Sequence, residues 1–215
     1  MAPYLLCFLM SLTQPCLMSI APENITALIL AGGKSSRMGQ DKGLLPFGNS
    51  IMAGHVIEQI RPQVGHILIS ANRNQDQYAK LGHKIIGDPI EGFQGPLAGF
   101  LAGLESIETD YLITLPCDGP FVLSNYVERM AKGLFNASAD IAVAHDGKRL
   151  QPVHVLLHRK VTEELKDTLE KGERKIDRWF PHHAWVTVDF SDAPQQFDNI
   201  NTPEDYKSAS GAEVA

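Results

Sequence analysis

The sequence has few cysteines, no long hydrophobic run and no excess of positive charge. Its three cysteines, Cys7, Cys16 and Cys117, form no C-x-x-C pair and show no zinc-type spacing, which excludes a disulfide scaffold and indicates a reducing, cytoplasmic compartment. No apolar run reaches the length of a membrane span. The 19 Lys and Arg residues are outnumbered by 25 Asp and Glu, giving a net charge of −6. This balance disfavours a general nucleic-acid binder, although a local cluster of cations could still bind a small anion.

The 215 residues, 44% of them hydrophobic and 20% charged, are typical of a soluble protein with one domain. We expect that domain over residues 24–208, with an extension at 1–23 and a frayed tail at 209–215. The extension contains a short apolar stretch, but no charged residue precedes Glu23. We therefore expect a start codon assigned too early, with Met18 as the true start; a secretory signal is the alternative.

Short apolar runs alternate with segments of helical periodicity from Ile25 onward. We expect strands over residues 25–31, 66–70, 84–87, 111–115, 140–144, 153–157 and 185–190. We expect helices over residues 51–60, 96–104, 122–134 and 160–171, and a last helix that Thr202 caps. This alternation predicts an α/β three-layer sandwich with a largely parallel central sheet and a Rossmann-like nucleotide-binding half. In such a sheet, ligands bind at the carboxyl ends of the strands.

A glycine-rich loop follows the first expected strand and has the sequence L-A-G-G-K-S-S-R-M-G-Q-D-K from Leu30 to Lys42. Its glycines let the backbone turn tightly and bring amide groups close to an anion. Lys34, Arg37 and Lys42 add three cations, the combination that a triphosphate requires. The loop is neither a Walker A motif, because position 28 is leucine, nor G-x-G-x-x-G. A solvated turn with scattered charges is the alternative.

Polar residues also follow the next three expected strands. Asp118, in L-P-C-D-G-P, ends the strand at 111–115 and could hold Mg²⁺ on phosphate oxygens. An ordinary turn before Gly119 is an equally good interpretation on these grounds. Asp88 and Asn72 are weaker cases at the ends of two other strands. Four successive strand ends nevertheless carry a polar or anion-binding group. Together they indicate a ligand site more strongly than any one of them does.

These motifs together resemble the molybdenum cofactor guanylyltransferase family. The resemblance rests on the loop above, on G-P-L-A-G at residues 95–99, on P-C-D at residues 116–118 and on N-x-N-T-P-E at residues 199–204. It covers residues 25 to 206. The L-A-G-G form looks like the guanylyl rather than the cytidylyl branch. The loop alone is shared with other nucleotidyltransferases of this fold, and its combination with the other motifs is more specific.

The resemblance implies a function and a set of site residues. GMP would pass from GTP to the phosphate of molybdopterin, with release of pyrophosphate. GTP-binding residues would be Leu30, Ala31, Gly32, Gly33, Lys42, Asn72, Asp88 and Asp118. Catalytic residues would be Arg37, Lys42 and Asp118, with Asp118 as the ligand of Mg²⁺. Asn199 and Asn201 are candidates for the molybdopterin site, although turn formation and helix capping explain them equally well.

Two alternatives to this function stay open at this point. One is another nucleotidyltransferase of the same fold, such as a molybdopterin cytidylyltransferase that uses CTP. The other is a GTP-binding module without turnover, which would have no need of a metal carboxylate at Asp118. We expect a monomer that makes transient contacts with other proteins of molybdenum cofactor biosynthesis or with molybdoenzymes.

Overall fold

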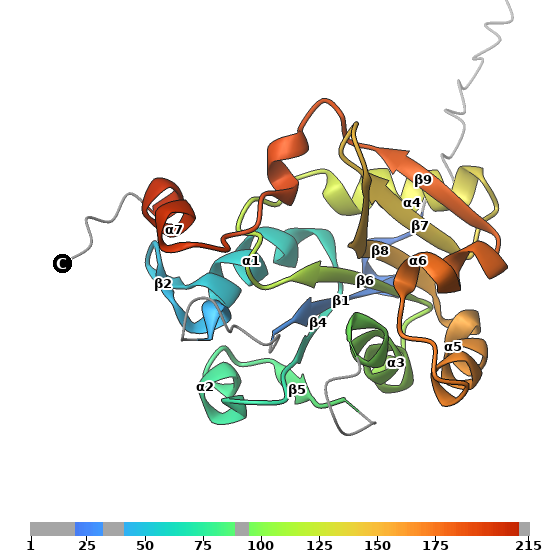
Figure 1. Ribbon diagram of the computed structural model, residues 1–215, viewed down its shortest axis with the longest axis horizontal. Helices are drawn as coiled ribbons and strands as arrows, with labels where there is room; N and C mark the ends of the chain where they lie inside the picture. The colour runs from blue at the N-terminus through green and yellow to red at the C-terminus, as the bar shows by residue number, and fades with distance from the viewer. Residues whose placement is uncertain (1–19, 32–40, 89–94, 211–215) are drawn as a thin grey trace, which may run out of the picture.

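A computed structural model describes residues 20–31, 41–88 and 95–210 of the chain. Its main sheet has seven strands in the order β5-β4-β1-β6-β8-β7-β9 (Figure 1). These strands are β1 (Ile25–Leu30), β4 (His66–Ser70), β5 (Lys84–Ile86), β6 (Tyr111–Pro116), β7 (Ile141–His145), β8 (Leu150–His158) and β9 (Trp185–Asp189). A separate two-stranded sheet pairs β2 (Pro46–Phe47) with β3 (Ser50–Ile51).

The helices connect these strands and cover the sheet. The α-helices are α1 (Met52–Ile60), α2 (Gln75–Ala79), α3 (Pro96–Ser106), α4 (Tyr126–Asn136), α5 (Thr162–Glu170), α6 (Ile176–Trp179) and α7 (Pro203–Ser210). Short 3-10 turns are η1 (Pro22–Asn24), η2 (Lys42–Leu44), η3 (Arg61–Gln63), η4 (Arg159–Val161), η5 (Phe180–His182) and η6 (Pro194–Phe197). The predicted α/β class with a central sheet between helical layers is confirmed.

The sheet is parallel except at β8. β1 pairs in parallel with β4 and β6, and β4 pairs in parallel with β5. β8 runs antiparallel to both β6 and β7, while β9 returns to the direction of β7. The reversal follows from the short turn between β7 and β8, where the Asp146 carboxylate accepts hydrogen bonds from the amides of Lys148 and Arg149. Strands joined by a turn this short can only pair antiparallel.

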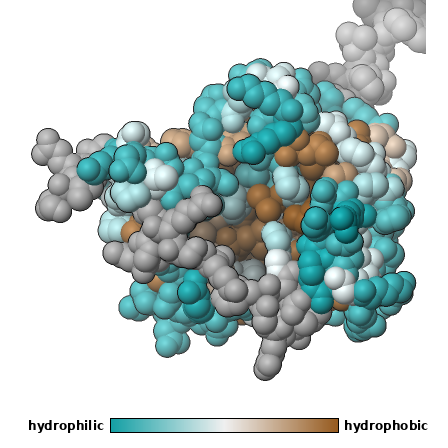
Figure 2. All heavy atoms as spheres, in the orientation of Figure 1, coloured by the Kyte–Doolittle hydropathy of each residue, from teal (hydrophilic) through white to brown (hydrophobic). Residues whose placement is uncertain are grey.

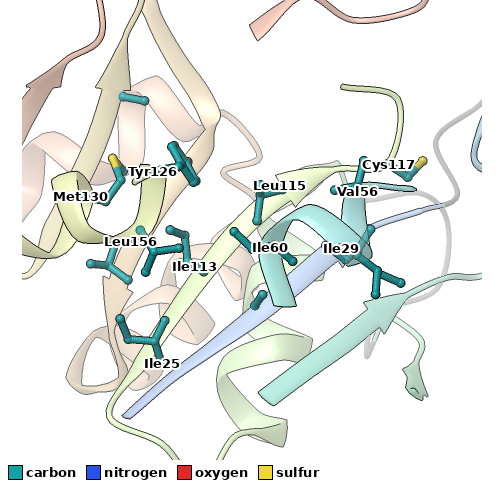
Figure 3. Packing of buried hydrophobic residues seen from close by; sticks show 14 of the residues in the cluster. Ile25, Ile29, Val56, Ile60, Ile113, Leu115, Cys117, Tyr126, Met130 and Leu156 are labelled. Atoms are coloured by element: carbon teal, nitrogen blue, oxygen red, sulfur yellow. The ribbon is translucent and has the colours of Figure 1, made fainter. Parts of the chain in front are cut away.

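Two apolar clusters fill the space between the sheet and its helices. On one face, side chains of β1 and β6 pack against α1 and α4, as Ile29, Ile113, Val56 and Met130 illustrate in Figure 3. On the other face, α3, α5 and α6 cover the same strands. A parallel sheet that is buried on both faces explains why its strands read as nearly continuous apolar runs.

Some element boundaries differ from those expected. The helix expected from residue 122 begins at Tyr126, because the side chain of Gln59 accepts a hydrogen bond from the Val122 amide and donates one to the Pro120 carbonyl, which holds an extended loop. The helix expected over 160–171 is divided into η4 and α5. Ile20, which precedes the expected domain at 24–208, packs against the core, and α7 continues to Ser210. Residues 1–19 lie outside the described part.

Gly103 allows α3 to approach the sheet closely. A β-carbon added there would lie 2.7 Å from a methyl group of Leu112 and 2.8 Å from one of Leu28. Both leucines are fully buried, so neither can move into open space. The absence of a side chain at this position therefore sets the distance between helix and sheet.

We expect Gly103→Ala to lower the free energy of unfolding by about 1–3 kcal/mol through overpacking. In an exposed helix the same change would raise stability by up to about 1 kcal/mol, so the sign of the effect is informative. Urea denaturation measures it, with Glu105→Ala at an exposed position of the same helix as the control. A stabilised Gly103→Ala protein would show that the helix can move away from the sheet at no cost.

Candidate active site

The carboxyl ends of β5, β4, β1 and β6 meet along one edge of the sheet (Figure 1). Backbone hydrogen bonds continue past the strands into the loops. The Ala31 amide donates to the Ser70 carbonyl at 2.8 Å, and the Cys117 amide donates to the Leu30 carbonyl at 3.1 Å. The first residue of each loop is thereby held in place. The four strand ends expected to carry polar groups lie next to one another, as the sequence indicated.

Lys42 lies at the centre of this edge. Its Nζ is 3.1 Å from Asp118 Oδ2 and 2.7 Å from Asn201 Oδ1. The side chains of Lys42 and Asp118 are only 14% and 19% exposed, so solvent screens their interaction less than that of a surface pair. Three predicted site residues, from η2, from the loop after β6 and from the segment before α7, thus form one cluster.

Asn72 and Asp88 form a second cluster at the same edge. The Asn72 side chain donates to Asp88 Oδ2 at 2.7 Å and accepts from the Asp88 amide at 2.8 Å. Burial raises the pKa of the Asp88 carboxyl, whereas the hydrogen bond from Asn72 acts in the opposite direction. A carboxylate at this place can accept hydrogen bonds from the N–H groups of a ligand.

The segment before α7 is attached directly to the loop after β6. The Ile200 amide donates to the Asp118 carbonyl at 2.8 Å, and the side-chain oxygen of Asn199 lies beside Gly119. Thr202 is the expected N-cap, because its hydroxyl accepts from the Asp205 amide while the Asp205 carboxylate accepts from the Thr202 amide. The site-facing positions of Asn199 and Asn201 therefore depend on a firmly capped helix.

The glycine-rich loop is described only at its two ends. Gly32, Gly33 and Arg37, together with Lys34, lie outside the described residues. Ala31 is described, and its amide is already bonded to Ser70, as the Leu30 carbonyl is to Cys117. The expectation that Leu30 and Ala31 bind GTP through their backbone stays a prediction. The Ala31 N–H belongs to the hydrogen-bond ladder of the sheet.

One set of contacts was missed by sequence reasoning. The Asp41 carboxylate accepts a hydrogen bond from the Tyr78 hydroxyl at 2.6 Å and another from the Asn74 side chain at 2.9 Å. Asp41 precedes Lys42 in the D-K motif, which was a usable signal. No sequence feature connected this motif to α2, which has only five residues.

A cavity of about 450 Å³ lies at the opposite edge of the sheet, by the amino-terminal ends of β4 and β5. Arg61, His66 and Lys84 line it, but so do Glu108 and the carboxyl end of α3. The negative end of that helix dipole and the Glu108 carboxylate offset the cations. This cavity is separate from the strand ends where the candidate residues gather.

Two kinds of feature are absent from the described residues. They contain no group of three or more His, Cys, Asp or Glu side chains that could hold a metal ion by themselves. They also contain no helix that is long and apolar enough to cross a membrane.

The fold and the site define a nucleotide-binding α/β protein with the architecture of a nucleotidyltransferase. The comparisons with known proteins agree. The family model described as MobA-like NTP transferase domain matches residues 27–186. The chain belongs to this family of nucleotidyltransferases.

Curated relatives identify the branch of the family. The chain is 47% identical over 189 residues to the molybdenum cofactor guanylyltransferase of Shewanella sediminis, covering 87% of this chain and 96% of the relative. It is 47% identical over 181 residues to the protein of that name from Shewanella pealeana, covering 84% and 90%. The solved structure of molybdopterin-guanine dinucleotide biosynthesis protein A from Archaeoglobus fulgidus has a TM-score of 0.72 at 24% identity, covering 86% of this chain and 97% of that one. That likeness supports the fold.

The Asn72–Asp88 contact makes a prediction about a pKa. We expect Asn72→Ala to raise the pKa of Asp88 further, because the variant loses the donor that stabilises the ionised carboxylate while burial remains. Carbon-13 NMR titration of the side-chain carboxyl groups measures this change. Asp205, whose pKa is held low by the amides of Asn201 and Thr202, serves as the internal control. An unchanged or lower pKa at Asp88 would contradict the contact.

Proposed function

We propose that this protein transfers GMP from GTP to the terminal phosphate of molybdopterin. A phosphate oxygen of molybdopterin forms a bond to the α-phosphorus of GTP, the bond from that phosphorus to the bridging oxygen breaks, and pyrophosphate leaves with the electron pair. The observation that carries the proposal is the cluster of Lys42, Asp118 and Asn201 at the strand ends. The name shared by the curated relatives supports guanosine as the nucleoside and molybdopterin as the acceptor.

The nucleophile is already an anion, so the reaction needs little proton transfer. Positioning and neutralisation of charge must supply most of the rate. Lys42 is suited to this task because it is a partly buried cation at the point where the loop, β6 and the C-terminal segment meet. In this proposal Lys42 and Arg37 balance the charge on the leaving pyrophosphate, and the amides of Gly32 and Gly33 bind phosphate oxygens.

Asp118 would hold Mg²⁺. A single partly buried carboxylate fits this ion, because Mg²⁺ commonly binds proteins through one or two carboxylates and takes its other ligands from phosphates and water. Bound there, the ion would supply a positive charge that stabilises the developing charge on phosphate oxygens. The Lys42 ammonium group donates a hydrogen bond to Asp118 Oδ2. Binding of a triphosphate would give the Lys42 ammonium group another anion to contact.

The remaining candidates are assigned by their place along the edge. Asn72 and Asp88 lie at the ends of β4 and β5, on the far side of β1 from Asp118, so we assign them to the guanosine part of GTP. Asn199 and Asn201 lie on the other side, and we assign them to molybdopterin. Figure 2 shows hydrophobic residues gathered across the middle of the face between α7 and α5, with hydrophilic residues around them. Such a surface suits the flat ring of a pterin.

The proposal includes a cytoplasmic, monomeric enzyme that hands its product to other proteins of cofactor assembly. Among the described residues the support for this compartment is Cys117, an unpaired and buried cysteine. Burial raises the pKa of the Cys117 thiol, which keeps it protonated and inert. Size-exclusion chromatography with light scattering tests the monomer.

The function itself is tested by mixing the purified protein with molybdopterin, Mg²⁺ and GTP, CTP or ATP. We expect pyrophosphate to be released with GTP and molybdopterin together, and far more slowly with CTP or ATP. Release with CTP at an equal or higher rate would indicate the cytidylyl reaction instead. Binding of GTP without any release of pyrophosphate would indicate a GTP-binding module.

The role of Asp118 is tested by Asp118→Asn. We expect turnover to fall at least about a hundredfold while GTP still binds weakly, because the amide keeps the size of the side chain but loses the charge that a hard cation requires. The measurement is pyrophosphate release as a function of Mg²⁺ concentration, with circular dichroism to check folding.

Asp140→Asn is a matched control for this experiment. Asp140 is also paired with a lysine, Lys160, and its side chain is 18% exposed against 19% for Asp118. It precedes β7 and therefore lies away from the carboxyl ends of the strands. We expect its turnover to equal that of the unchanged protein. Near-normal turnover of Asp118→Asn at ordinary Mg²⁺ would return Asp118 to the role of a turn residue.

A further inference from the structure

Lys42 is anchored at both ends of its side chain. Its ammonium group contacts Asp118 and Asn201, but a bound triphosphate would compete for that group. The backbone of Lys42 is anchored separately, through the residue before it. Both carboxylate oxygens of Asp41 accept hydrogen bonds, Oδ1 from the Tyr78 hydroxyl at 2.6 Å and Oδ2 from Asn74 Nδ2 at 2.9 Å. This second anchor does not depend on what the ammonium group contacts.

The side chain of Tyr78 is held firmly in the core. It is 0% exposed and belongs to the apolar cluster between the sheet and α1. Burial, with the neighbouring Cys117 and Asp41, raises the pKa of Tyr78, so its hydroxyl keeps the proton that it donates. Its oxygen also lies directly against η2, since a β-carbon at Gly43 would be 2.5 Å from it. The hydroxyl therefore contacts the chain on both sides of Lys42.

We infer that Tyr78 is a positioning residue for Lys42: through Asp41, its hydroxyl fixes the backbone from which the Lys42 side chain reaches the phosphates of the nucleotide. Asn74 supports the same carboxylate from the start of α2. Consecutive α-carbons are about 3.8 Å apart, so a fixed Asp41 leaves the base of the Lys42 side chain little freedom. A lysine side chain has four rotatable bonds, and a displaced base would spread its ammonium group over many positions. This inference rests on the proposed function for the identity of the ligand.

The test begins with Tyr78→Phe, which keeps the ring in the core and removes only the hydroxyl. We expect the Kd for GTP in the presence of Mg²⁺, measured by calorimetry, to rise about three- to tenfold, the usual effect of losing one hydrogen bond. Tyr126→Phe is the matched control, because Tyr126 is 1% exposed in the same cluster and its hydroxyl is 3.4 Å from His154, away from η2. Its Kd for GTP should equal that of the unchanged protein. An unchanged Kd for Tyr78→Phe would overturn the inference.

A double-mutant cycle separates positioning from a general structural role. If Tyr78 acts through Lys42, Tyr78→Phe should have little further effect on the Kd once Lys42→Ala has removed the ammonium group. The same fold-increase in both backgrounds would overturn the inference, because the hydroxyl would then act without Lys42.

Hydrogen exchange provides a readout that needs no nucleotide. The amides of Leu44 and Leu45 donate to the carbonyls of Asp41 and Lys42 in η2. We expect both amides to exchange faster in Tyr78→Phe and at the normal rate in Tyr126→Phe. Unchanged exchange in Tyr78→Phe would overturn the positioning role. If the unchanged protein did not bind GTP at all, the proposed function would fail, while the exchange rates would still decide whether Tyr78 holds the backbone of Lys42.

Discussion

The parallel pairing of β1 with β4 on one side and β6 on the other determines where the described candidate residues that follow these strands lie. Parallel strands bring their carboxyl ends to one edge, and here the ladder continues through Ala31 and Cys117 into the loops themselves. Side chains that are far apart in the sequence thereby meet. Lys42 and Asp118 are 76 residues apart, and Asn72 and Asp88 belong to neighbouring strand ends. Packing on both faces of the sheet keeps this edge rigid.

Lys42 is a partly buried cation at the strand ends where we propose that the triphosphate binds. Lys42 is kept in place by the Asp118 carboxylate and the Asn201 amide oxygen, while Asp41 and Tyr78 hold the backbone beside it. In the proposed function, phosphate would compete for the contacts of the ammonium group, whereas the hydrogen bonds of Asp41 do not involve that group. The backbone of Lys42 is thus held in place while its side chain remains flexible. A reaction that depends on positioning requires such an arrangement.

The C-terminal segment completes the site without contributing to the main core. α7 contains no buried residue, yet Ile200 is 2% exposed and its amide is bonded to Asp118. The hydroxyl of Tyr206 also donates to the Pro46 carbonyl, which ties α7 to β2. A few polar contacts around one apolar anchor thus hold Asn199 and Asn201 against the carboxyl end of β6.

The sequence alone determined the fold class and placed Asn72, Asp88 and Asp118 after their strands. Hydrophobic periodicity and turn residues reflect short-range structure, so a local pattern is enough to predict them. The parallel strands β1, β4, β5 and β6 were each located within about one residue for this reason. Only the tertiary structure decided that the Ala31 amide donates to the Ser70 carbonyl and that the Tyr78 hydroxyl supports Asp41. These features depend on contacts between residues that are distant along the chain. A local sequence pattern does not indicate which distant partner a backbone amide or a buried hydroxyl will contact.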